Sequence, residues 1–349
     1  MARSIAKGPK PRAGYATVNK NAPKPYAKAP RPAPVQQATT AKSTEPLGTV
    51  QVALLRAQKQ GMAKIDARIL LLHTLSKPTT DMAWLVANDN NPISTLQADA
   101  YSALCARRRA GEPVAYIVGH KAFYGLKLAV DKRVLDPRDD TETLVDWALE
   151  LLPTTVQAHP SRAEPTSVRT EPVEVLTKPS TGLGRAESGV LDLGTGSGAI
   201  ALAIQSKRPH AQVHASDASA DALAVAQANA TTHKLPVQFH QGSWLDAVKD
   251  QQFDLIVSNP PYIAAADPHL AALTHEPLQA LASGADGLDD IRQIIAQALQ
   301  YLNAGGWLLL EHGYDQAEPV AALLRNAGFN NIASRQDLAG VVRCTGGHR

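Results

Sequence analysis

A glycine-rich turn after an apolar strand does most to limit the folds open to this chain. The apolar run Val190-Leu-Asp-Leu leads directly into Gly194-Thr-Gly-Ser-Gly, and a helical pattern begins at Ala199. In doubly wound α/β folds, closely spaced glycines at such a turn let the backbone approach a nucleotide-like ligand. The turn therefore predicts a mostly parallel sheet with a ligand site at the carboxyl end of its first strand.

Beyond Arg138, apolar strand and helix patterns alternate along the chain. Strands are predicted at 190–193, 213–216 and 253–258, and helices at 199–207 and 221–230. This order is typical of a doubly wound sheet with helices packed on both faces. The predicted fold class is α/β, with a Rossmann-like and mostly parallel sheet.

Two regions of different character precede this pattern. Residues 1–46 form a basic tail of Pro, Ala and Lys, with too few large apolar residues to fold, and are predicted to be disordered. Residues 47–115 contain short helical stretches, one of them at 95–109, and predict a small helical-bundle domain. The side chains expected to share one helix face there are Ile65, Ile69 and Leu72.

A linker joins the helical domain to the α/β domain. Residues 116–137 carry aromatic and β-branched residues around Gly119 and Gly125, and predict a β-hairpin. The α/β domain then spans 138–349. It is interrupted at 154–188 by Pro, Thr, Ser and Glu without periodicity, which predicts a disordered insertion.

Positive charge is concentrated in the tail. Nine of the 35 Lys and Arg residues lie in the first 44 positions, which contain no Asp or Glu, so the remainder holds 26 basic and 32 acidic residues. These remaining residues, the body of the chain, are mildly acidic and so are unlike a phosphate-binding surface. No specific nucleic-acid partner is therefore expected. For the tail, a solvated extension is the favoured interpretation, and weak contact with ribosomal RNA is the alternative.

Cysteine usage and hydropathy indicate the cellular compartment in which the chain acts. Cys105 and Cys344 have no CxxC partner and no neighbours at metal-ligand spacing, so we expect two reduced thiols and no metal. No apolar run approaches the roughly 18 residues of a membrane span. No apolar signal segment follows Met1. The chain is expected to act in the cytoplasm, away from membranes and as a monomer.

The glycine spacing indicates the kind of ligand. Gly194, Gly196 and Gly198 follow a GxGxG pattern, which fits S-adenosylmethionine better than the GxGxxG of dinucleotide sites. Asp192 is placed to hold the methionine ammonium of that cofactor. Asp217, 19 residues after Gly198, is placed to bind ribose hydroxyls, with a helix cap as the alternative. An ordinary strand-to-helix turn is the alternative for the glycines themselves.

The most informative motif is Ser258-Asn-Pro-Pro-Tyr, which follows an apolar strand. An amide nitrogen is a poor nucleophile because its lone pair is delocalised, so a site that methylates it must orient both N–H groups. The Asn259 oxygen and the Pro260 carbonyl can accept those hydrogens, and the Tyr262 ring can stack on the flat amide. Pro260 and Pro261 stiffen the loop. These residues are predicted to bind and orient the substrate, unless the motif is an ordinary Asn-Pro turn.

Several segments resemble the release-factor glutamine N5-methyltransferases, the PrmC or HemK family. From Arg107 onward, and apart from the insertion, the resemblance covers most of the chain, and its Arg-x-Asp-Thr-Glu stretch is more specific than the glycines. The matching segments are Arg107-Arg-Arg-Ala-Gly-Glu-Pro-Val-Ala-Tyr-Ile, Pro137-Arg-Asp-Asp-Thr-Glu-Thr-Leu-Val, the glycine turn, Asn259-Pro-Pro-Tyr, Glu276-Pro-Leu-Gln-Ala-Leu, Gly284-Ala-Asp-Gly-Leu and Leu309-Leu-Glu-His-Gly.

The resemblance implies a class I methyltransferase that uses S-adenosylmethionine to methylate the glutamine of a Gly-Gly-Gln motif in peptide chain release factors. It also implies that the helical domain helps to grip the release factor. Trp244 follows the third strand, where its ring could lie against adenine, with a plain core tryptophan as the alternative. The cofactor residues carried over by position are Gly194, Thr195, Gly196, Ser197, Gly198, Asp217, Trp244 and Asn259.

Three positions depart from the family pattern. Asp139 stands in place of a proline, Ser243 in place of an aspartate that often precedes the tryptophan, and His275 in place of an aromatic residue. None of them lies in Asn259-Pro-Pro-Tyr.

Two other functions compete with glutamine methylation. The Asn-Pro-Pro-Tyr motif suits an exocyclic amine of adenine or guanine in DNA or RNA equally well, since a flipped base presents a similar planar nitrogen. The acidic body, without a basic target-recognition region, argues against that acceptor. A non-catalytic cofactor-binding or release-factor-binding protein is the third hypothesis, and the intact motif argues against it.

Overall fold

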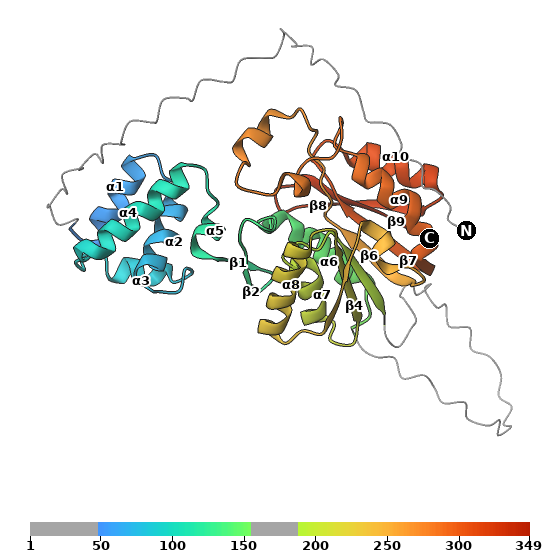
Figure 1. The fold of residues 1–349 in the computed structure, drawn as a ribbon, viewed down its shortest axis with the longest axis horizontal. Helices are drawn as coiled ribbons and strands as arrows, with labels where there is room; N and C mark the ends of the chain where they lie inside the picture. Colours follow the sequence, from blue (N-terminus) through green and yellow to red (C-terminus); the bar gives the residue numbers. More distant parts are fainter. Residues whose placement is uncertain (1–47, 155–187) are drawn as a thin grey trace, which may run out of the picture. The chain divides into compact units, whose positions relative to one another are not determined.

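The structure is a computed structural model that describes residues 48–154 and 188–349. The predicted basic tail, and all but the two ends of the predicted insertion, lie outside the described residues. The N-terminal helices and the α/β sheet are distinct along the chain (Figure 1).

Five helices form the first part of the described chain. Three of them begin at a polar residue, Thr49, Asp81 or Ser94, whose side chain accepts a first-turn backbone N–H and so satisfies an otherwise unpaired donor. The helix predicted at 95–109 is confirmed at both ends. The five are α1 (Val50–Lys59), α2 (Lys64–Thr74), α3 (Met82–Ala87), α4 (Thr95–Arg109) and α5 (Val114–Val118).

The buried face of α2 is not centred on the side chains predicted to share one face. Ile65 is 53% exposed, whereas Ala67, Leu70 and Leu72 are fully buried in the core of the helical part. Three consecutive leucines give this helix a broad apolar arc, so the spacing of isoleucines alone does not locate its centre. Ile65, predicted to share one face with Ile69 and Leu72, therefore lies outside the buried part of this helix.

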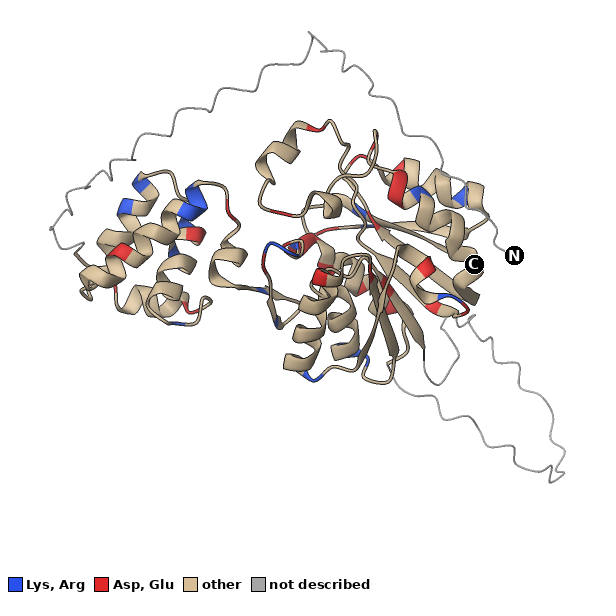
Figure 2. Ribbon diagram, in the orientation of Figure 1, with Lys and Arg blue, Asp and Glu red and all other residues tan. Residues whose placement is uncertain are grey.

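The last turn of α4 carries three arginines, residues 107–109 (Figure 2). Positive charge is favoured there by the partial negative charge of a helix C-terminus. Arg107 pairs with Glu112 at 2.5 Å, and Arg108 pairs with Asp66 at 2.7 Å. Because these guanidinium groups are engaged within the chain, the turn is not simply a free phosphate-binding patch.

The predicted hairpin is present but shorter than expected. Strands β1 (His120–Phe123) and β2 (Leu126–Ala129) pair antiparallel. Residues 116–118, assigned to the hairpin from the sequence, instead complete α5, and Ile117 packs into the helical core. Gly119 ends that helix with a φ of +78°, a left-handed conformation that glycine adopts without strain.

The described residues of the second part form one seven-stranded sheet in the order β5-β4-β3-β6-β7-β9-β8 (Figure 1). Strands β3 to β7 run parallel to one another, whereas β9 pairs antiparallel with both β7 and β8. The predicted mostly parallel α/β fold is confirmed. The strands are β3 (Gly189–Leu193), β4 (Gln212–Asp217), β5 (Val237–Gln241), β6 (Phe253–Ser258), β7 (Leu302–Glu311), β8 (Asn330–Gln336) and β9 (Val342–His348).

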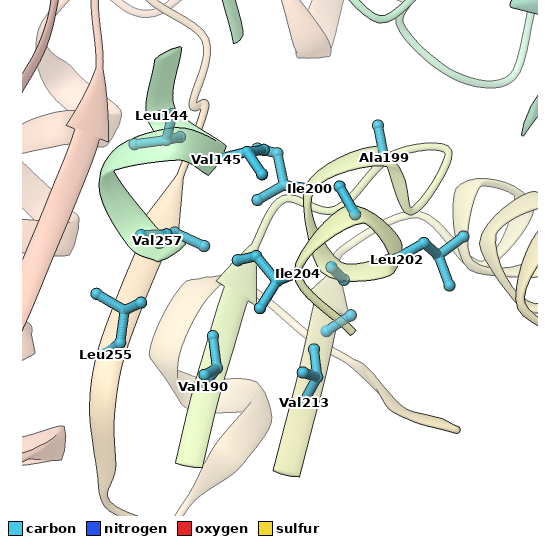
Figure 3. Close-up of a cluster of buried hydrophobic side chains, with 14 of the residues drawn as sticks. Leu144, Val145, Val190, Ala199, Ile200, Leu202, Ile204, Val213, Leu255 and Val257 are labelled. Atoms are coloured by element: carbon cyan, nitrogen blue, oxygen red, sulfur yellow. The ribbon is translucent and has the colours of Figure 1, made fainter. Parts of the chain in front are cut away.

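Helices cover both faces of this sheet because successive strand residues point to opposite sides. Val190 packs with α6 and α7 on one face (Figure 3), whereas Leu191 packs with α9 and α10 on the other. The helices are α6 (Glu142–Leu151), α7 (Ala199–Lys207), α8 (Ala220–His233), α9 (Asp289–Tyr301) and α10 (Ala317–Ala327). Short 3-10 helices are η1 (Asp139–Thr141), η2 (Trp244–Val248), η3 (Pro268–Ala272) and η4 (Leu278–Ala280).

Both cysteines are unpaired and buried. Burial raises the pKa of the Cys105 and Cys344 thiols, so neither is a ready nucleophile. Within residues 48–154 and 188–349, every helix is too short or too polar to cross a bilayer.

Candidate active site

Four parallel strands end side by side at one edge of the sheet, and the predicted site residues lie at that edge. Leu193 of β3 is level with Ser216 of β4 on one side and with Ser258 of β6 on the other. Ser258 is in turn level with Leu310 of β7. The strand order reverses between β3 and β6, and such a reversal is where doubly wound sheets hold their ligands.

The glycine turn after β3 is held by its neighbour β4. The N–H groups of Gly194 and Thr195 both donate to the Ser216 carbonyl at 2.9 Å. The N–H of Gly196 donates to Asp217 Oδ2 at 2.9 Å. The turn is therefore fixed before any ligand arrives, and its position depends on the second strand as well as on its own glycines.

Two glycines of the turn have different surroundings. Gly198 has a φ of +84°, and a Cβ there would lie 3.1 Å from Leu202 and 3.2 Å from Ala226, so conformation and space both require glycine. Gly196 has a φ of +55°, and no atom of the described chain lies within 4 Å of the place of its Cβ. The turn thus has a packed side and an open side, and the open side is available to a ligand.

Asp192, on strand β3, holds the glycine turn through hydrogen bonds. Its Oδ2 accepts a 2.6 Å hydrogen bond from the Thr195 hydroxyl and a 3.1 Å bond from the Ala201 N–H, while Oδ1 is buried with no partner in the described residues. Burial raises the pKa of this carboxyl to about 7. Ser197 is also buried, and its carbonyl accepts from Asn229 at 2.9 Å. Contact of Asp192, Thr195 and Ser197 with the cofactor stays a prediction.

Asp217 joins the two loops beside the turn. Its Oδ2 accepts from Gly196, and its Oδ1 accepts from the Ser219 N–H at 2.9 Å. Ser219, and not Asp217, caps α8, through a 3.2 Å bond from the Ala222 N–H. Each carboxylate oxygen keeps a second lone pair, so the predicted bond to ribose hydroxyls remains open to Asp217.

Trp244 lies against the same turn. A Cβ at Gly194 would be 3.2 Å from the Trp244 ring, and the indole N–H donates to Asp290 Oδ1 at 3.2 Å. The ring is half-buried, so it is not simply a core tryptophan. Its contact with the glycine turn supports a place on the cofactor side, and its role toward adenine stays a prediction.

The predicted acceptor loop begins beside β3. The Ser258 hydroxyl donates to the Leu193 carbonyl at 2.8 Å and so ties the ends of the two strands together. The next residue, Asn259, donates from Nδ2 to the Thr141 hydroxyl at 3.1 Å. The amide nitrogen of Asn259 therefore faces η1, and its oxygen is left for another partner.

The remainder of the loop is held from outside. Pro260 and Pro261 are buried, and the Tyr262 carbonyl accepts from Gln316 Nε2 at 3.0 Å. A Cβ at Gly287 would lie only 2.2 Å from that carbonyl, so the chain passes Tyr262 where only glycine fits. Burial raises the pKa of the Tyr262 phenol, which keeps the ring neutral. The tyrosine is thus suited to stacking and not to proton abstraction.

Asp139, one of the departures from the family pattern, has a local role. It begins η1 and pairs with Lys121 at 2.9 Å. The adjacent Arg138 makes two hydrogen bonds to Glu276, at 2.6 and 2.9 Å, and the glutamate side chain is buried. This pair ties the segment before η1 to the chain between η3 and η4.

Four residues around the acceptor loop were not predicted from the sequence: Thr141, Gly287, Glu311 and Gln316. Three of them lie in segments quoted for the family resemblance, so a signal was present. No local spacing connects any of them with Asn259, however, because they reach the loop from distant parts of the chain.

Family models match both parts of the chain. A methyltransferase small domain model matches residues 174–327, and a PrmC N-terminal domain model matches residues 51–119. Among solved structures, a methyltransferase from Pyrococcus furiosus is 17% identical and has a TM-score of 0.43, covering 71% of this chain and 98% of that one.

Curated relatives match over almost their whole length. Release factor glutamine methyltransferases from Xylella fastidiosa and Bordetella pertussis are 44% and 42% identical to this chain. The alignments cover 85% and 82% of this chain, and 97% and 96% of the relatives. A protein of the same name from Coxiella burnetii is 41% identical, over 80% of this chain and 90% of its own. This chain therefore belongs to the release factor glutamine methyltransferase family.

Proposed function

We propose that this protein transfers a methyl group from S-adenosylmethionine to the side-chain amide nitrogen of the Gly-Gly-Gln glutamine in peptide chain release factors. One observation carries the proposal: the Asn259-Pro-Pro-Tyr loop lies at the end of β6, next to the glycine turn of β3, in a member of the release factor glutamine methyltransferase family. The loop supplies acceptors for an amide, and the turn supplies a place for the methyl donor.

The residues of the turn fit the cofactor. Gly196 leaves open space, Asp192 keeps a buried oxygen without a partner, and Asp217 keeps free lone pairs on both oxygens. We assign the methionine ammonium to Asp192, the ribose to Asp217, and adenine to Trp244. S-adenosylmethionine supplies the methyl group on a sulfonium, which leaves as a neutral thioether.

Binding and orientation of the acceptor amide are the tasks of the loop. The Asn259 oxygen and the Pro260 carbonyl accept the two N–H hydrogens of the substrate glutamine, and the Tyr262 ring packs on its plane. The methylated amide is strongly acidic and loses its proton readily, so a dedicated general base is not required. Orientation and exclusion of water supply most of the rate enhancement.

The N-terminal helices are proposed to recognise the release factor. They match the PrmC N-terminal domain model, and they expose large apolar side chains that a protein partner can cover. These are Val52, Leu55, Ile65, Val86 and Leu96. We therefore treat residues 47–115 as a recognition domain, 116–137 as its linker and 138–349 as the catalytic domain.

The enzyme is proposed to act in the cytoplasm and as a monomer. Light scattering of the purified protein tests the oligomeric state. The tail at 1–46 is proposed to make at most weak contact with ribosomal RNA.

Mass spectrometry of release factor incubated with enzyme and S-adenosylmethionine tests the main proposal. One added methyl group on the Gly-Gly-Gln glutamine is expected, and a release factor with that glutamine replaced by alanine should stay unmodified. Labelled methyl that appears in DNA or RNA, and not in the release factor, would instead assign the acceptor to a nucleobase amine. The names of the relatives and the acidic balance of the body do not favour that outcome.

A further inference from the structure

A buried carboxylate lies behind the acceptor loop and takes no part in the chemistry described above. Glu311 is the last residue of β7 and is 1% exposed, and its Oε2 has no hydrogen-bond partner in the described residues. Leu310 is level with Ser258, so Glu311 and Asn259 are neighbours at the ends of adjacent strands. Hydrogen bonding from Thr141 and Asn259 lowers the pKa of the Glu311 carboxyl. An incompletely paired carboxylate in a protein core is costly, so stability alone does not explain Glu311.

The hydrogen-bonding capacities of these three groups fix their directions. An ionised carboxylate only accepts hydrogen bonds, so Thr141 and Asn259 must both act as donors toward Glu311. Asparagine can donate only from its nitrogen. The Thr141 hydroxyl has one hydrogen, and once that points at Glu311, its oxygen is left to accept the 3.1 Å bond from Asn259 Nδ2. Both contacts therefore hold the nitrogen of the amide inward and its oxygen outward.

We propose that Glu311 and Thr141 are positioning residues that prevent the Asn259 amide from flipping, and so keep its oxygen directed at the N–H of the acceptor. This inference rests on the proposed function, in which the Asn259 oxygen accepts that hydrogen. A flipped amide would present N–H groups to the N–H groups of the substrate, and the acceptor would be repelled instead of oriented.

The charge of Glu311 depends on its surroundings. Burial raises the pKa of this carboxyl to about 7, with Asp140 of η1 acting in the same direction, while Arg343 of β9 and hydrogen bonds from Thr141 and Asn259 act against it. The remaining titratable groups that face it are the phenol of Tyr262 and the thiol of Cys344.

Protonation of Glu311 would undo the arrangement, because a neutral carboxyl can donate as well as accept. Thr141 could then accept from Glu311 and donate to the oxygen of a flipped Asn259 amide. The turnover rate at saturating S-adenosylmethionine should therefore rise as the pH increases through about 7, where Glu311 becomes ionised.

Kinetics of paired variants test the positioning role. Thr141→Val removes the hydroxyl at nearly constant volume, Thr141→Ser keeps it, and Glu311→Gln removes the charge. We expect kcat to fall on the order of 10- to 100-fold in Thr141→Val and Glu311→Gln, with KM for release factor changed far less, and to stay within about threefold in Thr141→Ser. The melting temperature of each variant reports the structural cost separately.

A buried carboxylate at the other end of the sheet is the matched control. Asp254 is 5% exposed and accepts from the Gly189 N–H at 2.9 Å and from Asn303 at 2.8 Å, near the start of β6. Asp254→Asn should lower the melting temperature and leave both kcat and its pH profile unchanged. At saturating S-adenosylmethionine, the rise of kcat near pH 7 should disappear only in Glu311→Gln. The pKa of Asp192 is also raised to about 7, but this residue is assigned to cofactor binding.

A second readout does not depend on turnover. In protein labelled with 15N-asparagine, the side-chain signal of Asn259 is the one absent from Asn259→Ala. It should shift with a midpoint near pH 7 in the wild type and in Thr141→Ser, and stay unshifted in Glu311→Gln. If the wild type shows this titration but does not methylate release factor, the positioning role stands and the acceptor was wrongly assigned. An Asn259 signal insensitive to pH, or wild-type kcat in both Thr141→Val and Glu311→Gln, would overturn the inference.

Discussion

The two halves of the active site are built in different ways. The cofactor turn, residues 194–198, is held mainly by its own glycines and by backbone bonds to Ser216 and Asp217 on the adjacent strand. The acceptor loop, residues 259–262, is held mostly by side chains from elsewhere in the chain. Its supports include Thr141, 118 residues away, and Gln316, 54 residues away from Tyr262.

The cofactor turn meets a general requirement, binding of the methyl donor, and the acceptor loop meets a specific one, binding of the substrate. A turn that depends on strand and glycine geometry can bind the same donor in many methyltransferases, since its support belongs to the sheet. An acceptor loop that depends on remote side chains can be adjusted without disturbing the sheet. Changes to the two halves should therefore have separable effects, with cofactor affinity altered by the first and turnover by the second.

The largest effect is expected from Asn259→Ala. Loss of the oxygen that orients the acceptor should lower kcat by roughly 100- to 1,000-fold, equivalent to about 3 to 4 kcal/mol in the barrier. The fold should persist, because the strand and the prolines around the loop remain. Steady-state kinetics with release factor measure the loss, and calorimetry with S-adenosylhomocysteine measures cofactor binding. Unchanged turnover would show that Asn259 only shapes a turn.

A backbone change should break the acceptor loop while sparing the cofactor turn. Gly287→Ala places a Cβ 2.2 Å from the Tyr262 carbonyl, so the loop must move, and a shift of about 1 Å can lower kcat roughly 100-fold. Gly125→Ala is the matched control, because it has a similar φ of +81° but no neighbour within 4 Å. Equal losses of kcat in both variants would point to backbone strain alone and contradict the role of the close contact.

The residues of the cofactor turn could be predicted from the sequence more fully than the supports of the acceptor loop. The glycine turn, the strand ends and Asn259 were predicted because each belongs to a contiguous pattern. Gln316 and Glu311 were not, because their partners are set by tertiary packing that no local spacing encodes. Ile65 shows the same limit in the fold, since its spacing placed it on one face with Leu72, yet it is 53% exposed while Leu72 is fully buried.

Cofactor affinity should depend on pH through the other half of the site. The pKa of Asp192 is raised to about 7, and a cationic ammonium favours the ionised form. Affinity for S-adenosylmethionine should therefore increase as pH rises from 6 to 8, by up to about tenfold. Asp192→Asn should bind about tenfold more weakly at pH 8 and lose this dependence. Calorimetry across pH measures both effects, and a Kd that does not change with pH in the wild type would remove Asp192 from the ammonium site.

The smallest effect is expected from Trp244→Phe. Phenylalanine keeps an aromatic ring beside the glycine turn, so contact with adenine should survive and the Kd for S-adenosylmethionine should change less than about threefold. The indole bond to Asp290 is lost, which should lower stability by about 1 kcal/mol. Trp244→Ala removes the ring as well and should weaken binding further, while kcat at saturating cofactor stays near the wild-type value in both variants. If Trp244→Phe instead lowered kcat and left Kd unchanged, the tryptophan would belong with the acceptor loop, and the two halves of the site would not be separable at this residue.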